Sequence, residues 1–312
     1  MEEKELSELD EITFGIYSAE EIKKLAVCEI NSSKLCSSDK NVGYGTVYDP
    51  RLGTIENGKN CETCNQNIWG CAGHFGYISL HEAIIHPLFY KQVVSFLKCF
   101  CIKCFSLLIT EDQINLSGFN RTHSTKRFNK ILEKLEKIDI CHNCSQIQPD
   151  IKYITADSSI SMIYKQKDKG KVSITLPVDD IKKTFDNISD HDVELLGFDP
   201  KLVHPRNLIL TVFPVVPTCA RPYIISEGNI CDDDLTIQIV EIIKANNHLE
   251  VVEGTPASET KRQKYLQSLK FRIATFYNNS SGKAKHTTNG RAIKGLKERM
   301  TGKHLCSQEV IA

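Results

Sequence analysis

The spacing of apolar residues predicts that helices and strands alternate along the chain. Residues 86–99 carry one apolar helical stripe, made of Phe89, Val93, Phe96 and Leu97. Further helices are predicted at 126–137 and 178–188. Apolar runs typical of strands occur at 75–80, 151–155, 160–164, 172–176 and 207–215. These patterns together predict an α+β fold with small antiparallel sheets.

Two longer helical patterns predict an antiparallel helical hairpin. Residues 232–249 carry one seam, formed by Leu235, Ile239, Ile242 and Leu249, with Asn246 filling the register. Residues 259–277 carry a second seam, formed by Leu266, Leu269, Ile273 and Phe276. The linker at 251–258 contains Gly and Pro, which are typical of a tight tip. Three consecutive aspartates at 232–234 are interpreted as helix-capping acids rather than metal ligands.

Two further segments are predicted to be irregular. Residues 216–222 are expected to form an exposed loop, because two prolines exclude a helix. Residues 280–290 predict a flexible loop, and 291–300 a short basic helix. One acid, Glu298, accompanies the basic residues Lys283, Lys285, Arg291, Lys294, Lys297, Arg299 and Lys303. A solvated charge run is the alternative, but this clustering in a neutral chain favours contact with a phosphate backbone.

The composition limits the class of protein. A chain of 312 residues has room for about two domains, and an apolar content of 41% is enough for a core. The net charge is zero, so bulk charge does not indicate nucleic-acid binding. No apolar run approaches the roughly 18 residues of a membrane helix, and the acidic N-terminus is unlike a secretory signal. We therefore expect an intracellular, reducing environment and no membrane partner.

The spacing of cysteines predicts two structural zinc sites. The first set is a C-x2-C turn and a C-x2-H turn, with the ligands Cys61, Cys64, Cys71 and His74. The second set is two C-x2-C turns, with the ligands Cys101, Cys104, Cys141 and Cys144. Each turn directs two ligands at one centre, and four such ligands satisfy a tetrahedral Zn²⁺.

Other interpretations of the cysteines are weaker. Disulfides are disfavoured, because the chain has thirteen cysteines, an odd number, and no secretory signal. A cysteine redox enzyme is disfavoured, because the C-x2-C turns lack the strand-then-helix setting that lowers a thiol pKa. Cys99 lies two residues before Cys101 and is an alternative ligand of the second set, but Cys101 and Cys104 are preferred, because C-x-C is a poorer chelating turn than C-x2-C.

Several longer motifs occur in a defined order. Y-D-P-R-L-G (48–53) precedes the first cysteine set, and H-P-L-F (86–89) follows it. Further along are L-L-G-F-D-P (195–200), H-P-R-N-L-I-L-T-V-F-P-V-V-P (204–217), D-D-D-L-T (232–236) and N-G-R-A-I-K-G-L-K-E-R-M-T-G-K (289–303). Over about residues 12–303, this order resembles the N-terminal clamp of the largest subunit of multisubunit DNA-dependent RNA polymerases. The motifs resemble the versions in large DNA viruses more than those of a cellular nuclear enzyme.

The resemblance implies a zinc-braced clamp with four functional parts. These are a zinc-binding clamp head (1–150), a clamp core with a lid loop (151–231), a protruding coiled-coil hairpin (232–278), and a rudder-like loop with a basic hinge (279–312). It further implies that template DNA or an RNA–DNA hybrid is contacted by Arg221, Lys283, Lys285, Arg291, Lys294, Lys297, Arg299 and Lys303. A transcription factor is expected at the tip of the hairpin.

The resemblance also implies that this chain alone is inactive. In the family, a loop of the type N-A-D-F-D-G-D holds Mg²⁺ for two-metal nucleotide addition, and nothing in this sequence matches it. A split subunit, an exon-like first piece or a truncated frame is therefore expected, with other polymerase subunits and a separate catalytic fragment as partners. The expected location is the nucleus, or host cytoplasm and virion for a viral protein. The alternative is a free-standing zinc and nucleic-acid-binding module.

Overall fold

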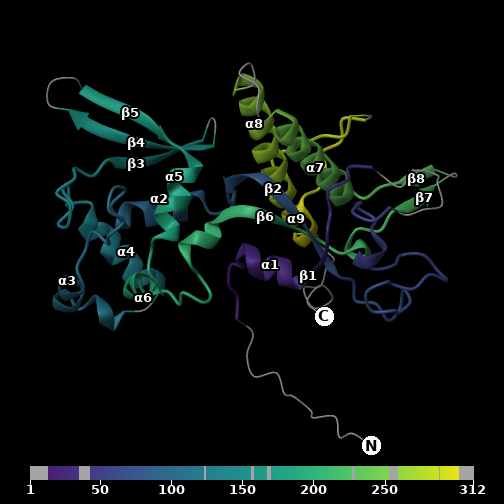
Figure 1. Cartoon of the computed structure of the whole chain (residues 1–312), viewed down its shortest axis with the longest axis horizontal. Helices are drawn as coiled ribbons and strands as arrows, with labels where there is room; N and C mark the ends of the chain where they lie inside the picture. The colour runs from purple at the N-terminus through teal and green to yellow at the C-terminus, as the bar shows by residue number, and fades with distance from the viewer. Residues whose placement is uncertain are drawn as a thin grey trace, which may run out of the picture. The chain divides into compact units, whose positions relative to one another are not determined.

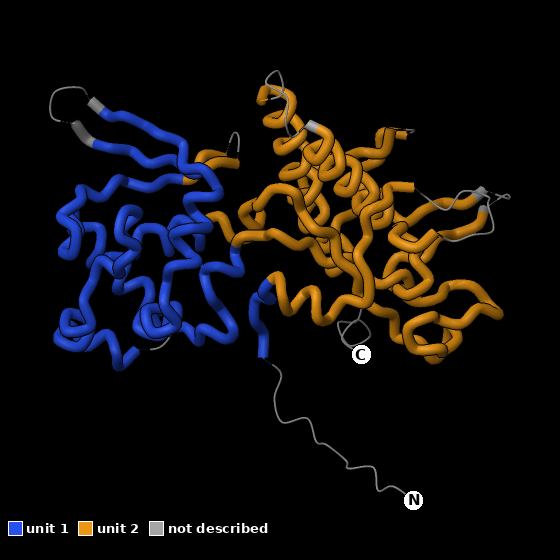
Figure 2. Tube along the Cα trace, in the orientation of Figure 1, with its two compact units in different colours: residues 1–18, 91–152, 160–208 blue, residues 19–90, 153–159, 209–312 orange. Residues whose placement is uncertain are grey.

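The computed structural model describes residues 13–34, 43–122, 124–155, 158–166, 170–226, 229–252, 259–287 and 289–301. The chain forms two compact units, which Figure 2 shows in different colours. The first unit comprises residues 1–18, 91–152 and 160–208, and the second unit comprises residues 19–90, 153–159 and 209–312. The four functional parts expected from the resemblance describe roles rather than compact units, and they stay a prediction.

A mixed three-stranded sheet is the centre of the second unit (Figure 1). Its strands, in the order β1-β2-β6, are β1 (Ala26–Glu29), β2 (Phe75–Ile85) and β6 (Ile209–Val215). β6 is antiparallel to β2, but β1 is parallel to it. The prediction of small antiparallel sheets is therefore wrong for the pairing of β1 with β2. The long segment between β1 and β2 supplies the crossover that a parallel pair requires.

The helices α7 (Asp234–Val252) and α8 (Glu259–Tyr277) lie side by side (Figure 1). Of the predicted seams, Leu235, Ile239, Ile242, Leu249, Leu269, Ile273 and Phe276 are buried, and Leu266 is partly buried. Val240, Ile243 and Ala245 are buried too, because α7 also packs on β2. Much of the helix pair thus belongs to the core. Coiled-coil geometry stays a prediction, and residues 253–258 of the linker lie outside the described residues.

Asn246 shows why a polar residue occurs within this seam. The register between β2 and β6 shifts between Ser79 and Ile84. Asn246 is buried there; its Nδ2 donates to the Ser79 carbonyl at 2.9 Å, and its Oδ1 accepts from the His81 N–H at 3.0 Å. The side chain therefore satisfies two backbone groups at the irregularity, which would otherwise lose hydrogen bonds on burial.

Shorter elements complete the second unit. Helix α1 (Ala19–Leu25) contacts β6 and β2. The strands β7 (Ile224–Ser226) and β8 (Asn229–Cys231) form an antiparallel pair, and α9 (Leu296–Met300) follows the basic loop. None of the helices in the described part of the chain combines the length and the apolar character needed to span a membrane.

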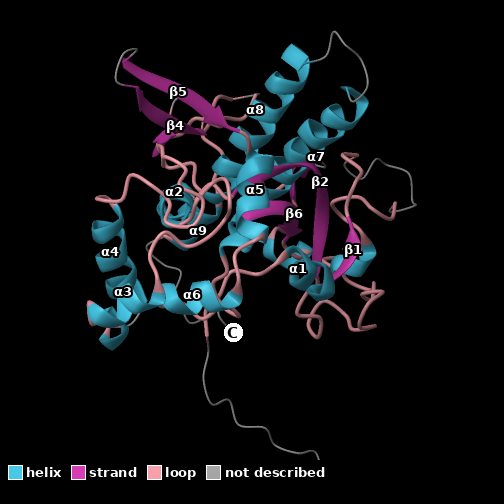
Figure 3. Cartoon of the chain, turned by 60° about the vertical axis from the view of Figure 1, so that its left-hand side comes forward, coloured by secondary structure: helices cyan, strands magenta, loops and turns pink. Residues whose placement is uncertain are grey.

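The first unit is built mainly from helices, shown in cyan in Figure 3. They are α2 (Tyr90–Cys99), α3 (Glu111–Leu116), α4 (Ser124–Leu135), α5 (Val178–Asp186) and α6 (Asp190–Leu196). All of α2 except its first residue belongs to this unit. Phe96, Phe128 and Phe198 form an aromatic cluster with ring centroids 4.9 to 5.6 Å apart. The sheet β3-β4-β5 consists of β3 (Asp150–Ile154), β4 (Ser159–Gln166) and β5 (Gly170–Leu176).

The start of α2 differs from the prediction. The helix was expected from residue 86, but it begins at Tyr90. His86 forms a turn before it, because its carbonyl accepts from the Phe89 N–H at 3.0 Å and its Nδ1 accepts from the Leu88 N–H at 3.2 Å. Pro87 therefore lies in this turn rather than in the first helical turn.

Candidate metal centres and basic segment

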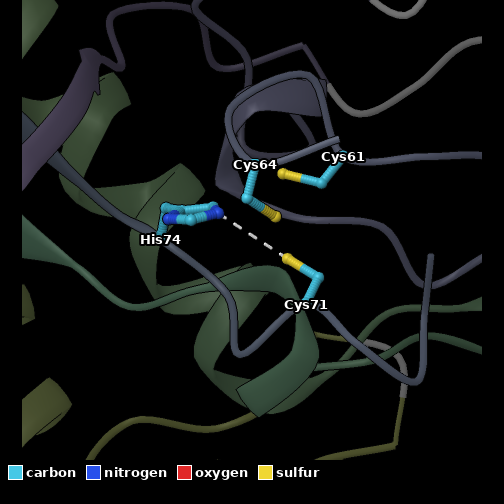
Figure 4. A group of neighbouring side chains, drawn as sticks. All are labelled: Cys61, Cys64, Cys71 and His74. Atoms are coloured by element: carbon cyan, nitrogen blue, oxygen red, sulfur yellow. Dashed lines mark hydrogen bonds between the residues drawn. The ribbon is translucent and has the colours of Figure 1, made fainter. Parts of the chain in front are cut away.

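Each of the two cysteine sets is gathered at one point. In the first set, the Sγ atoms of three cysteines and a ring nitrogen of His74 lie within 4.8 Å of one another (Figure 4). In the second set, the four Sγ atoms of Cys101, Cys104, Cys141 and Cys144 do the same. Among the described residues, no further group of three or more His, Cys, Asp or Glu side chains is gathered in this way.

The distances within both sets suit zinc. A tetrahedral Zn²⁺ with Zn–S bonds of about 2.3 Å separates its sulfur ligands by about 3.8 Å. Cys101 Sγ lies 3.5 Å from Cys144 Sγ, and Cys104 Sγ lies 3.7 Å from Cys141 Sγ. In the first set, Cys71 Sγ lies 3.7 Å from His74 Nε2, where a tetrahedral zinc requires about 3.6 Å. Both sets could hold zinc in a closed, structural site.

The three C-x2-C turns share one backbone conformation. In each, the first cysteine accepts an N–H from the residue four positions later and donates to the carbonyl five positions later, at 2.8 to 2.9 Å. The residues four positions later have positive φ angles: Asn65 at 56°, Phe105 at 61° and Ser145 at 55°. Residues other than glycine seldom adopt this conformation. Because the three residues differ in type, the shared hydrogen-bonding pattern of the turn accounts for this backbone conformation.

The thiols within each set affect one another's ionisation. The hydrogen bond with His74 lowers the pKa of Cys64 to about 7, whereas burial raises the pKa of Cys71 to about 11. Burial opposes ionisation of Cys104, but hydrogen bonds from Ser106 and the neighbouring thiols lower its pKa to about 6. The Gln146 N–H favours the Cys144 thiolate, yet burial and the other thiols raise its pKa to about 12. Closely spaced thiolates repel one another, so full ionisation requires a cation between them.

Cys99 does not join the second set. Its thiol is fully buried and donates to the Ser95 carbonyl at 3.3 Å, and burial raises its pKa. The structure therefore gathers Cys101 and Cys104, rather than Cys99, with the second turn.

The basic residues of the predicted nucleic-acid segment form two groups. Arg291 Nη2 donates to Asp234 at 3.0 Å, and Arg299 pairs with Asp233. The other group is exposed and forms no ion pair within the described part of the chain: Lys283, Lys285, Lys294 and Lys297. Lys303 lies outside the described residues. Among the described basic residues of this segment, the four lysines are thus available to an external phosphate.

The described part of segment 280–290, which was expected to be a flexible loop, contains backbone pairing. Lys285 and Ala292 form an antiparallel bridge, and the Ile293 N–H donates to the Ala284 carbonyl at 3.0 Å. Asn279 is buried beside this pair, and its Nδ2 donates to the carbonyls of Ala284 and Ile293 at 2.9 and 2.7 Å. The predicted helix at 291–300 is also shorter, because residues 291–293 belong to this pairing and helix begins only at Leu296.

Arg221 does not lie on an exposed loop. Its side chain is 0% exposed; Nε donates to the Val216 carbonyl at 3.0 Å, and Nη1 donates to Thr236 Oγ1 at 3.2 Å. Nη2 donates to the Val47 carbonyl, and burial lowers the pKa of Arg221 to about 10. The prediction of an exposed segment at 216–222 is therefore wrong for this residue. Its guanidinium joins three segments of the second unit and has no access to a hybrid in this conformation.

Comparison with known proteins decides the family of the chain. The family model described as RNA polymerase Rpb1, domain 1, matches residues 6–304. The chain belongs to this family. Individual relatives of this Rpb1 domain 1 chain agree with the match.

A probable DNA-directed RNA polymerase II subunit RPB1 homolog of Invertebrate iridescent virus 6 is 35% identical over 96% of this chain and 36% of its own length. The DNA-directed RNA polymerase subunit Rpo1N of Sulfolobus acidocaldarius is 32% identical over 94% of this chain and 34% of its own. The DNA-directed RNA polymerase II subunit RPB1 of Euplotoides octocarinatus is 31% identical over 94% of this chain and 64% of its own length. The Rpb1 domain 1 chain thus spans about a third of the length of the first two relatives.

The acidic partners of the basic segment were missed from the sequence. Asp233 and Asp234 were interpreted only as capping acids of the helix. Asp233 does cap α7, because its Oδ1 accepts from the Leu235 N–H at 2.8 Å. Its pairing with Arg299, and that of Asp234 with Arg291, are additional. A signal was present, since an acidic triplet and a run of seven basic residues occur in a neutral Rpb1 domain 1 chain.

Proposed function

We propose that this chain supplies the zinc-braced clamp of the largest subunit of a DNA-dependent RNA polymerase and binds nucleic acid there. Its relatives are DNA-directed RNA polymerase subunits. The observation that carries the proposal is a set of four exposed lysines that form no ion pair with any described residue, on a segment that is otherwise held by hydrogen bonds. Exposed lysines of this kind are suited to phosphate oxygens.

The proposal assigns one structural zinc to each cysteine set. Cys61, Cys64, Cys71 and His74 would hold one ion, and Cys101, Cys104, Cys141 and Cys144 the other. Zinc bound by four protein ligands has no open position, so it contributes folding free energy rather than catalysis.

The nucleic-acid contacts are assigned to Lys283, Lys285, Lys294 and Lys297. Lysine contacts to phosphates release condensed counterions and carry no base sequence, which suits a surface that holds any template DNA or RNA–DNA hybrid. Arg291 and Arg299 are given a structural part, because each is paired with an acid. Arg221 is left out, because its side chain is buried.

Catalysis is proposed for the assembly rather than for this chain. Nucleotidyl transfer would need the Mg²⁺-binding loop of the remaining largest-subunit sequence and the other polymerase subunits. A transcription factor would bind at the tip between α7 and α8. A nuclear site, or the host cytoplasm or virion, is proposed in line with the viral relative.

The salt dependence of nucleic-acid binding tests the lysine assignment. We expect the double change Lys294→Ala and Lys297→Ala to lower the slope of log affinity against log salt by up to about 1.8 on duplex DNA, since each phosphate contact contributes about 0.9. The matched control is Lys126→Ala with Lys130→Ala, two exposed lysines of α4. Equal slopes for the wild-type chain and the Lys294/Lys297 variant would remove the assignment.

Purification with a tag on this chain separates the polymerase from the free-standing module. Two zinc ions per chain together with co-purifying polymerase subunits support the proposal. Two zinc ions with the chain alone support the alternative of an independent zinc and nucleic-acid-binding module.

A further inference from the structure

Three consecutive aspartates at the start of α7 bind three different segments. Asp232 Oδ1 accepts from the Tyr48 hydroxyl at 2.6 Å. Asp233 accepts from Arg299 of α9 through both carboxylate oxygens. Asp234 accepts from the loop that leads to α9. Capping of α7 accounts for only one of these acids, so the contacts to Tyr48, to Arg299 and to the loop before α9 are additional to capping.

Of the three aspartates, Asp234 accepts the most hydrogen bonds from the basic segment. Its Oδ1 accepts from His286 Nε2 at 2.9 Å and from Arg291 Nη2 at 3.0 Å. Its Oδ2 accepts from the backbone N–H of Lys294 at 2.8 Å. The Asp234 side chain is only 8% exposed, so its charge is directed at these donors rather than at solvent.

The paired backbone brings Lys283, Lys285 and Lys294 close together, and Lys297 follows in α9. Residues 284–286 pair with residues 291–293, which places Lys283 and Lys285 on one segment and Lys294 on the segment opposite. The bond from the Lys294 N–H to Asp234 holds that segment against the start of α7. Gln238 Nε2 also donates to the Lys294 carbonyl at 3.3 Å.

We propose that Asp233 and Asp234 are positioning residues for nucleic-acid binding: they fix residues 284–299 so that Lys283, Lys285, Lys294 and Lys297 meet a phosphate backbone as one set. This inference rests on the proposed function of the four lysines. Ordering the segment before binding removes a cost that a mobile loop would meet when it binds.

The direction in which the removal of Asp234 changes nucleic-acid affinity distinguishes a positioning role from a simple charge effect. Asp234 is an anion beside cations, so its removal should strengthen binding to a polyanion if only charge matters. If positioning matters, its removal should weaken binding, because the lysines are no longer held as one set. The substitution Asp234→Asn tests this, since asparagine has one acceptor oxygen and cannot serve the donors on both sides of Asp234.

The experiment uses the full chain and a fluorescently labelled DNA duplex. For Asp234→Asn we expect binding about eightfold weaker at about 0.1 M salt and a salt slope lower by about 0.9, the effect of losing one phosphate contact. Without DNA, amide hydrogen exchange in residues 284–294 should be faster. His286→Ala removes one bond to Asp234 and should change both readouts less, in the same direction.

Asp49→Asn is the matched control. Asp49 is also a buried carboxylate of the second unit, and it binds Arg51 Nε at 2.9 Å and the Gly45 N–H at 2.6 Å. We expect it to leave exchange at 284–294 and the salt slope unchanged. Equal effects of Asp49→Asn and Asp234→Asn would show general loosening and would overturn the inference.

The remaining outcomes are also decisive. Tighter binding by Asp234→Asn, or unchanged exchange at 284–294, would overturn the positioning role even if the lysines bind DNA. A wild-type chain without salt-dependent binding would overturn the proposed function and this inference with it. In that case faster exchange in Asp234→Asn would assign the aspartates to folding of the segment alone.

Discussion

The two metal-ligand sets share one type of turn but are embedded differently in the chain. The first set lies in a loop that contacts a distant segment, since Thr218 Oγ1 donates to the Gly53 carbonyl at 3.0 Å and Cys219 Sγ to the Ala72 carbonyl at 3.4 Å. The second set joins two turns separated by α3 and α4. Each of its turns is flanked by a local bridge, Phe100 with Leu107 and Ile140 with Ile147. The same local chemistry thus supports a core contact in one unit and closes a long loop in the other.

This difference predicts how far the loss of a metal should spread. Closing a long loop restricts the unfolded chain, so the second set affects everything between its turns. The first set has non-metal contacts that still hold its loop when a ligand is lost.

Cys104→Ser should have the largest effect. We expect one zinc per chain instead of two. The free energy of unfolding of the first unit should fall by several kcal/mol, because structural zinc supplies about 10–16 kcal/mol in small zinc domains. Metal analysis and urea denaturation measure both quantities. Amide exchange should rise between residues 100 and 148. Exchange that rises only at the two turns would show that the aromatic cluster holds the segment without the metal.

Cys64→Ser should also release one zinc but loosen a smaller region. The loop around the first set keeps its bonds from Thr218 and from the His74 N–H, which donates to the Leu52 carbonyl at 3.0 Å. We expect faster amide exchange at residues 61–74 and 217–221, with the sheet β1-β2-β6 still protected. Loss of protection throughout the second unit would contradict the contrast between the two sets.

Gly73→Ala should disturb the core contact of the first set without removing a ligand. Gly73 has a φ of 83°, and an added Cβ would lie 2.5 Å from Cys219 Sγ and 2.6 Å from Pro217 Cβ. We expect the free energy of unfolding to fall by about 2–4 kcal/mol, with two zinc ions retained. Urea denaturation and metal analysis check these two results.

Gly58→Ala is the control for Gly73→Ala. Gly58 has the same φ of 83°, but nothing lies within 4 Å of an added Cβ. It should therefore report only the backbone strain, at about 1 kcal/mol. Equal losses at the two positions would mean that the contact with residues 217–219 contributes nothing to stability.

These contrasts also show what could be predicted from the sequence. The gathering of each cysteine set follows from local spacing, because a C-x2-C turn orients its two ligands within a few residues. The parallel pairing of β1 was missed, because it depends on how a long connection crosses the sheet. The ion pair between Arg291 and Asp234 joins residues 57 positions apart, and no local pattern specifies it. The burial of Arg221 was missed for the same reason, since its hydrogen-bond partners are supplied by tertiary packing.

The smallest predicted effect tests whether the turns of the two sets are equivalent. Ser145 has a φ of 55° and Asn65 a φ of 56°, but asparagine tolerates this conformation better than serine. Glycine relieves the strain of about 1 kcal/mol and adds about 0.5–1 kcal/mol of unfolded-chain entropy. Ser145→Gly should therefore be neutral or slightly stabilising, whereas Asn65→Gly should be slightly destabilising. Thermal denaturation of both zinc-loaded variants measures this. The opposite order would mean that the metal sets, through their different surroundings, impose unequal strain on turns with the same backbone.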